Sequence, residues 1–145
     1  MSDITTVILA AGNSTRFKAS KSKLVYPLCG LPIVSHIFNI AKKISGKNIL
    51  VVSNEKNKEE LKLILNTSKL VVQKKQKGTA DAIEQVKKFV KSKNILILFG
   101  DTPLVEVKDI RKLVSKFKRS KAKASLIAFN TAAVSYTHLT LPTMS

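Results

Sequence analysis

The sequence predicts a doubly wound α/β fold with a mainly parallel sheet. Short apolar runs without polar alternation are separated by stretches in which apolar residues recur at helical spacing. Unbroken apolar runs are typical of strands that are covered on both faces, as in a parallel sheet. Alternating strands and helices imply right-handed crossovers that place helices on both faces. Ligands of such sheets bind at the carboxyl ends of the strands.

The individual elements follow from these patterns. Strands are expected at 6–10, 49–52, 70–72, 95–99 and 125–129. The first helix is expected from apolar residues that share one helical face, namely Ile33, Ile37, Ile40, Ala41 and Ile44. Three later helices are expected around Leu61, Ile64 and Leu65, around Ile83, Val86, Phe89 and Val90, and around Val107, Ile110, Leu113, Val114 and Phe117. A ligand site is therefore expected in the loops after Leu9, Val52, Val72 and Phe99.

The 145 residues carry a formal net charge of +17. Such a charge is expected of a protein that binds nucleic acid or phosphate-rich ligands, and the alternative is an ordinary solvated surface. The excess is almost entirely lysine spread along the chain, and aromatic residues do not alternate with basic clusters as stacking platforms would. We therefore expect nucleic acid not to be a partner, although a basic nucleic-acid-binding module is the alternative of a different class.

Composition favours a reducing, cytoplasmic setting without a membrane partner. No apolar run approaches the roughly 18 residues of a membrane helix, and the N-terminus lacks the features of a secretory signal. The single cysteine, Cys29, cannot form an internal disulfide and is expected to be a buried small apolar residue. His36 falls within the first helical pattern and is expected to be structural. The oligomeric state is left open.

The first motif follows the first strand, where 9–17 reads Leu-Ala-Ala-Gly-Asn-Ser-Thr-Arg-Phe. The small residues Ala11 and Gly12 allow a ligand to approach the backbone closely, and Gly12 can adopt a positive φ. Free backbone N–H groups of such a turn can hold phosphate oxygens. Arg16 adds a planar fork of donors and Lys23 adds a second positive charge. The alternative is an ordinary turn with a surface arginine.

The second motif pairs Gln73 with the run Gly-Thr-Ala-Asp-Ala at 78–82. Gln73 ends a strand and can both donate to and accept from the edge of a pyrimidine. Gly78 and Thr79 stand at an expected helix start, where they offer close backbone approach and a hydroxyl group. The alternative is that Thr79 only caps the helix.

The third motif is Asp101, which follows Gly100 directly after an expected buried strand. A carboxylate at this position suits a hard cation, and Mg²⁺ uses few protein carboxylates because it also binds substrate phosphates. The alternative is a turn-forming aspartate before Pro103.

In this order and spacing the motifs resemble the signature of nucleotidyltransferases that activate sugar phosphates. The resemblance runs over 4–130 and also includes Gly-x-Pro-hydrophobic at 30–33. Ser14 stands where the family usually has Gly, and Ser22 where it usually has Pro. The Gly-Thr-Ala-Asp-Ala block fits best with the uridyltransferases that make UDP-N-acetylglucosamine. Another sugar-phosphate or MobA-like nucleotidyltransferase is the alternative.

The resemblance implies a Rossmann-like nucleotidyltransferase domain and an enzyme that transfers a uridylyl group from UTP to N-acetylglucosamine-1-phosphate, releasing pyrophosphate. By the same resemblance the cofactor would be Mg²⁺, held by Asp101. Arg16 and Lys23 would be catalytic because they neutralise the triphosphate. The nucleotide would be bound by Leu9, Ala11, Gly12, Lys23, Gln73, Gly78 and Thr79.

Two segments are expected, the nucleotide-binding part at 1–130 and an anomalous, non-native tail at 131–145. From Ala124 to Ser145 there is no charged residue, and the tail is rich in serine and threonine. It matches neither the Tyr-Gly-Arg segment of the family nor the later asparagine that supplies a second metal ligand. The domain is therefore expected to be a fragment whose sheet is incomplete on its C-terminal side.

Overall fold

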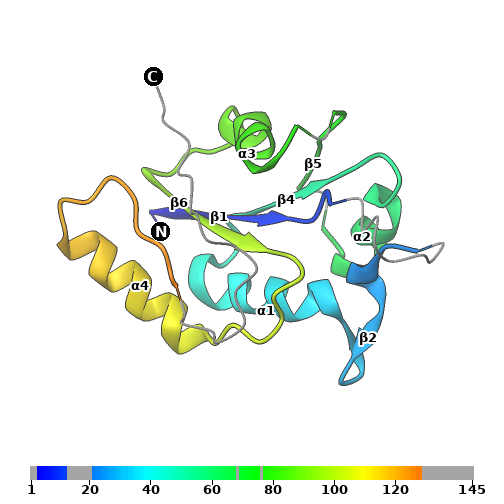
Figure 1. Cartoon of the computed structure of the whole chain (residues 1–145), viewed down its shortest axis with the longest axis horizontal. Coiled ribbons are helices and arrows are strands. Elements are labelled where there is room, and N and C mark those ends of the chain that lie inside the picture. Colours follow the sequence, from blue (N-terminus) through cyan, green and yellow to red (C-terminus); the bar gives the residue numbers. More distant parts are fainter. Residues whose placement is uncertain (1–2, 13–20, 68, 76, 129–145) are drawn as a thin grey trace. The chain divides into compact units, whose positions relative to one another are not determined.

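The computed structural model describes residues 3–12, 21–67, 69–75 and 77–128 (Figure 1). It contains two compact units, Met1–Val107 and Lys108–Ser145. The elements of the first unit are β1 (Ile4–Leu9), the 3₁₀ turn η1 (Lys23–Val25), β2 (Pro27–Leu28), β3 (Leu31–Pro32), α1 (Ile33–Ser45), β4 (Ile49–Ser53), α2 (Lys58–Leu65), β5 (Leu70–Val72), α3 (Thr79–Lys87) and β6 (Asn94–Phe99). Helix α4 (Val107–Arg119) belongs almost entirely to the second unit. Among the described helices none is long and apolar enough to cross a membrane.

The main sheet of the first unit is parallel, with the strand order β5-β4-β1-β6. The chain moves outward from β1 through β4 to β5 and then crosses back to add β6 on the other side of β1. Helices α1 and α3 lie on opposite faces of this sheet, as Figure 1 shows. The doubly wound α/β prediction is therefore confirmed, and its topological switch point lies between β1 and β6.

Strand β1 is covered on both faces because successive side chains of a strand point in opposite directions. Val7 belongs to a buried apolar cluster with Ala82 and Val86 of α3. Its neighbour Thr6 instead accepts a 2.8 Å hydrogen bond from the hydroxyl of Ser45, at the end of α1. Strand β1 is therefore buried on both faces, as predicted for a central parallel strand.

The buried face of α1 differs from the predicted one. The helix spans the expected residues, but the side chains that it buries are Val34, Ile37, Phe38, Ala41 and Ser45. Ile37 and Ala41 were predicted correctly, whereas the other predicted apolar residues are half-buried. Ile33, Ile40 and Ile44 all lie along one side of the true contact stripe, so apolarity alone shifted the predicted stripe toward them.

Two expectations about strands are wrong. Strand β6 alternates: Leu96 and Leu98 are buried, but Ile95, Ile97 and Phe99 are exposed. The reason is that α3 contacts β1, β4 and β5 while β6 forms the edge of the described sheet. The second error is the strand expected at 125–129, because the described residues 125–128 form no strand. An apolar run becomes a strand only where a neighbouring strand pairs with its backbone.

Cys29 is exposed, which contradicts the expectation of burial. It forms the tip of the β2–β3 hairpin together with Gly30, and both residues have positive φ angles, 49° and 81°. Two consecutive positive φ angles are the geometry of a tight two-residue hairpin turn. His36 has the structural role expected of it, since its Nε2 lies 2.8 Å from the carbonyl oxygen of Leu28 and ties this hairpin to α1.

Two buried serines should respond oppositely to replacement by alanine. Ser53 Oγ is fully buried and has no hydrogen-bond partner among the described residues, whereas Ser45 Oγ donates to the buried Thr6 hydroxyl. Ser53→Ala is expected to raise the free energy of unfolding by about 1 kcal/mol, because it removes an unpaired polar group. Ser45→Ala is expected to lower it by about 1–2 kcal/mol. Urea denaturation of both variants checks this, and a loss of stability in Ser53→Ala would contradict it.

Candidate functional site

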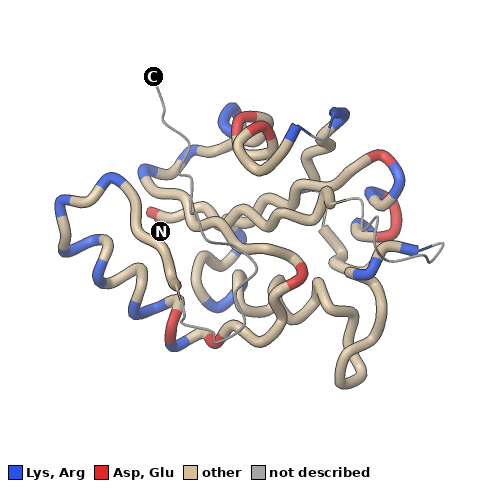
Figure 2. The backbone as a smooth tube through the Cα atoms, viewed as in Figure 1, with Lys and Arg blue, Asp and Glu red and all other residues tan. Residues whose placement is uncertain are grey.

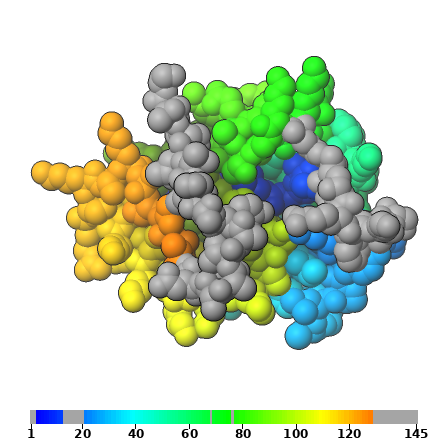
Figure 3. Space-filling model, in the orientation of Figure 1, coloured from blue at the N-terminus to red at the C-terminus, as the bar shows by residue number. Residues whose placement is uncertain are grey.

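The loops that leave the parallel strands are tied together beyond the sheet itself. The N–H of Ala10 donates to the carbonyl of Val52 at 2.8 Å, and the N–H of Gln73 donates to the carbonyl of Ser53 at 2.8 Å. These bonds hold the segments after β1, β4 and β5 beside one another. In Figure 3 atoms of the β1 end (dark blue) are visible at the surface next to green atoms of the β5–α3 region. The first three predicted loops thus meet at one edge.

The segment after β6 closes on β1 at the switch point. Gly100 donates its N–H to the carbonyl of Leu9 at 2.9 Å. A Cβ atom at position 100 would lie only 3.1 Å from that oxygen, so any side chain there would crowd the close approach. The approach places Asp101 beside the loop that follows β1, and the side chain of Lys23 meets it there: Lys23 Nζ lies 2.5 Å from Asp101 Oδ2.

The Lys23–Asp101 pair joins two predicted site residues that are 78 positions apart. Both side chains remain about two-fifths exposed, at 42% and 41%. An exposed ion pair contributes little to stability, about 0–1 kcal/mol. The pair therefore has the properties of an accessible, charged site at the carboxyl ends of β1 and β6. Ser22, which replaces the family's usual proline, has its hydroxyl 3.4 Å from the N–H of Leu24 and caps the turn that carries Lys23.

Two asparagines after β4, which the sequence analysis did not single out, hold the β1 loop. Asn54 Nδ2 donates to the carbonyl of Ala11 at 2.9 Å, and Asn57 Nδ2 donates to the carbonyl of Ala10 at 2.8 Å. Their side-chain oxygens accept backbone N–H groups of 54–57 at 2.9–3.0 Å. Both residues are buried, at 6% and 3% exposure. Asparagines just after a strand favour such side chain–backbone turns, which is the signal that could have identified them.

The other predicted residues of the β1 loop are Leu9, Ala11, Gly12 and Arg16. Gly12 is not among the described residues with positive φ, so it does not use the backbone freedom that glycine offers, and its role in nucleotide binding stays a prediction. A Cβ atom at Gly12 would meet nothing within 4 Å, so its backbone is open to solvent. Ala11 is buried and Leu9 half-buried. Arg16 lies outside the described residues, so its role stays a prediction.

Gln73 is 4% exposed, and its amide nitrogen has two acceptors. Nε2 donates to Asp81 Oδ2 at 2.6 Å and to the carbonyl of Gly78 at 3.2 Å. Gln73, the first residue of the second motif, is thereby tied to the start of α3. Asp81 was part of the recognised block but was given no role.

The start of α3 has no side-chain cap. Gly78 occupies the cap position with φ of 103°, which only glycine adopts readily, and Thr79 is the first residue of the helix itself. The alternative in which Thr79 caps the helix is therefore wrong. The exposed Thr79 and the uncapped N–H groups of the first turn stand beside Gln73.

The described residues contain no group of three His, Cys, Asp or Glu side chains that could enclose a metal ion. Asp101 nevertheless offers an accessible carboxylate, and its partner is the long, flexible side chain of Lys23. An octahedral cation such as Mg²⁺ needs only one or two protein carboxylates when substrate phosphates and water supply the other oxygens. Asp101 therefore fits a cation that arrives with a phosphate ligand, and does not fit a protein-enclosed metal centre.

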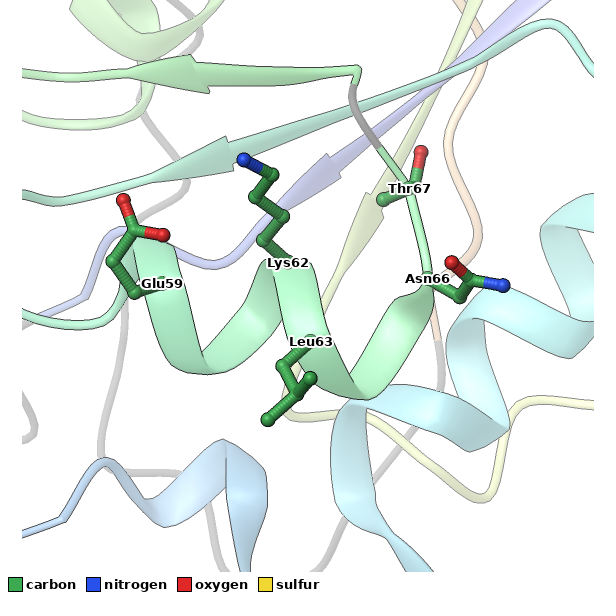
Figure 4. A pocket seen from close by; sticks show the side chains of 5 residues that line it. All are labelled: Glu59, Lys62, Leu63, Asn66 and Thr67. Carbon is green, nitrogen blue, oxygen red and sulfur yellow. The ribbon is translucent and has the colours of Figure 1, made fainter.

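A shallow hollow elsewhere lies along α2 and the turn after it. Figure 4 shows the side chains that line it, Glu59, Lys62, Leu63, Asn66 and Thr67. None of the predicted site residues is among them. Leu63 is 83% exposed, so the hollow offers little burial to a ligand. The strand ends remain the better candidate site.

Basic residues are not concentrated in one segment of the chain. Figure 2 shows Lys and Arg on successive parts of the backbone, from the turn before η1 through α2 and α3 to α4. A lysine-rich solvated surface accounts for this distribution.

Comparison with known proteins supports a specific family. The profile of the MobA-like NTP transferase domain matches residues 6–141. The bifunctional protein GlmU of Buchnera aphidicola subsp. Schizaphis graminum is 43% identical over 120 residues, which cover 81% of this chain and 26% of that protein. GlmU of Campylobacter fetus is 38% identical over 134 residues, 89% of this chain and 30% of that protein. The chain thus spans about a quarter to three-tenths of the length of these relatives.

Solved structures agree on the fold. A putative glucose-1-phosphate thymidylyltransferase from Bacillus anthracis has a TM-score of 0.73 at 22% identity, over 81% of this chain and 51% of that one. Rv0371c from Mycobacterium tuberculosis has a TM-score of 0.66 at 20% identity, over 77% and 59%. The profile match and the identity to the GlmU proteins confirm the resemblance that the motifs carried: the chain belongs to the MobA-like NTP transferase domain family, a family of nucleotidyltransferases.

Proposed function

We propose that this chain is the nucleotide-binding part of a uridylyltransferase that joins UTP to N-acetylglucosamine-1-phosphate. The reaction is attack of a sugar-phosphate oxygen on the α-phosphate of UTP, with pyrophosphate as the leaving group. The observation that carries the proposal is the pairing of Lys23 with Asp101 at the switch point. In this proposal Lys23 would bind a phosphate and Asp101 would bind the metal. The identity to the GlmU proteins supports this choice of nucleotide and acceptor. A cytoplasmic location is part of the same proposal.

Catalysis of this reaction consists mainly of positioning and charge neutralisation. The open backbone at Gly12 and the uncapped start of α3 would bind the nucleotide, with Ala11 and Gly78 keeping the backbone close to it. Lys23 would exchange its carboxylate partner for a phosphate oxygen, and Arg16 would supply further positive charge. Leu9, Gln73 and Thr79 would complete the nucleotide contacts.

A divalent cation bound at Asp101 would neutralise phosphate charge and polarise the phosphoryl group whose phosphorus is attacked. Mg²⁺ is the proposed metal because it prefers a single carboxylate with phosphate oxygens. One structure of the same fold, Rv0371c, was solved in complex with manganese, at 18% identity and a TM-score of 0.62. We propose Mn²⁺ as a usable substitute in binding experiments.

The test is nucleotide binding and turnover by the chain with Mg²⁺ present. Calorimetry with UTP, CTP, dTTP, ATP and GTP is expected to give the tightest binding for UTP. Pyrophosphate release is then measured with N-acetylglucosamine-1-phosphate and with glucose-1-phosphate as acceptors. Preference for another nucleotide would favour a different sugar-phosphate or MobA-like transferase. Binding of DNA or RNA with steep salt dependence, without any nucleotide binding, would favour the nucleic-acid-binding module.

Replacing Lys23 by alanine is expected to weaken binding of UTP with Mg²⁺ about tenfold, because a charge-assisted contact to phosphate is lost. The matched control is Lys21→Ala, which removes an exposed lysine two residues away and leaves the Asp101 pair in place. Calorimetric titration of both variants makes the comparison. Equal affinities in the two variants would show that general positive charge, not Lys23, attracts the nucleotide.

A further inference from the structure

We propose that Asp81 determines base specificity by fixing the orientation of the Gln73 amide, so that the site accepts a nucleobase with a ring N–H and rejects one without it. This inference rests on the proposed function, since it assigns the base that the nucleotide carries. It concerns a residue in the first turn of α3 that the reaction itself does not use.

The orientation of the Gln73 amide follows from chemistry. A side-chain amide has a donor end and an acceptor end, and the two ends can exchange by rotation. The groups beside Nε2 are a carboxylate oxygen of Asp81 at 2.6 Å and the carbonyl oxygen of Gly78 at 3.2 Å. A backbone carbonyl oxygen can only accept a hydrogen bond, and the Asp81 carboxylate oxygen accepts one here as well. The donor end must therefore face Asp81, and both its hydrogens are used.

What remains of Gln73 for a ligand is its carbonyl oxygen. No described donor is paired with Oε1. Among the described residues, Ser53 Oγ is the side-chain atom that is fully buried and has no partner. Gln73 Oε1 also has no described donor, but it is not fully buried, so a ligand can reach it from the surface. Gln73 thus loses the dual capacity that its amide has in isolation and becomes an acceptor.

An acceptor discriminates between pyrimidines held in the same place. The N3 atom of uracil or thymine carries a hydrogen and can donate to Oε1. The N3 atom of cytosine presents a lone pair, so that two acceptors would face each other. A buried polar group that is left without a partner costs about tenfold or more in affinity. The Asp81–Gln73 contact therefore points to uracil or thymine nucleotides as the substrate class.

The decisive probe on the unmodified chain is N3-methyl-UTP, which lacks only the ring N–H. We expect the chain with Mg²⁺ to bind UTP at least about tenfold more tightly than both CTP and N3-methyl-UTP, in calorimetric titrations. Equal binding of UTP and N3-methyl-UTP would overturn the inference while leaving the proposed function intact. Failure to bind any nucleotide would overturn both.

The variant that tests Asp81 itself is Asp81→Asn, which lets the Gln73 amide take either orientation. We expect UTP to bind more weakly and CTP more tightly, so that the ratio of their affinities falls to within about threefold. The matched control is Glu84→Gln, on the exposed side of the same helix, which is expected to keep the parent ratio. An unchanged ratio in Asp81→Asn would overturn the inference. A merely structural role of Asp81 would weaken both nucleotides equally, and circular dichroism verifies that the variants are folded.

Discussion

Replacing Asp101 by asparagine is expected to remove the dependence of UTP binding on divalent metal. In the parent chain, Mg²⁺ or Mn²⁺ should raise the affinity for UTP, because the cation joins the Asp101 carboxylate to phosphate oxygens. Asparagine keeps the shape of the side chain but not its charge. The stabilisation that a metal supplies to a reacting phosphate is several kcal/mol, so turnover should fall by about 100-fold or more. Titration with UTP in the presence and absence of metal gives the binding result, and pyrophosphate release gives the turnover.

The fold should survive this change, which makes the result interpretable. The Lys23–Asp101 pair is exposed at both ends, so its loss should lower the free energy of unfolding by at most about 1 kcal/mol. Asp109→Asn, in the first turn of α4, is the matched control for a lost carboxylate. Asp101→Asn that keeps metal-dependent binding would contradict the metal assignment. Loss of metal-dependent binding in Asp109→Asn as well would show that net charge, not position, governs metal binding.

The sequence predicted the sheet well because a parallel strand that is buried on both faces needs consecutive apolar residues, which are visible in the sequence. The runs that became β1 and β4 are buried along nearly their whole length. The same pattern gave wrong expectations in two places. Strand β6 is apolar but has no described helix over one of its faces, and the apolar residues 125–128 have no described strand beside them. Composition reports the tendency of a segment to be buried, whereas pairing depends on residues far away in the sequence.

The location of the site was predictable, but its contacts were not. Parallel strands must end at one edge, so the loops containing Gln73 and Asp101 had to approach the β1 loop. No local pattern indicates that Lys23 pairs with Asp101 78 positions later, or that Asn57 reaches the carbonyl of Ala10. Such contacts depend on how far each strand extends before its loop begins relative to the neighbouring strand, which is set by the strand register. The family motif therefore indicated Lys23, Gln73 and Asp101 as candidates. It did not indicate Asn54 and Asn57, which hold the β1 loop, or the contact of Asp81 with Gln73.

Replacing Asn57 by alanine is expected to have the largest effect on stability. The side chain is 3% exposed and connects two backbone groups, because Nδ2 donates to the carbonyl of Ala10 and Oδ1 accepts the N–H of Asn54. Each buried group left unpaired costs about 1–3 kcal/mol. We therefore expect Asn57→Ala to lower the free energy of unfolding by about 2–4 kcal/mol, measured by urea denaturation. Asn39→Ala, on the exposed side of α1, is the matched control and should change it by less than about 0.5 kcal/mol.

Asn57→Asp separates the two bonds of this side chain. Aspartate keeps an oxygen that can accept the N–H of Asn54, but it places a second oxygen opposite the carbonyl of Ala10. Two acceptors then face each other in a buried place, so the loss should be at least as large as that of Asn57→Ala and smaller at low pH, where the carboxyl can donate. The pH dependence follows because protonation restores a donor at Ala10. Equal stability of Asn57→Asp and the parent at neutral pH would show that the Ala10 contact does not hold the β1 loop.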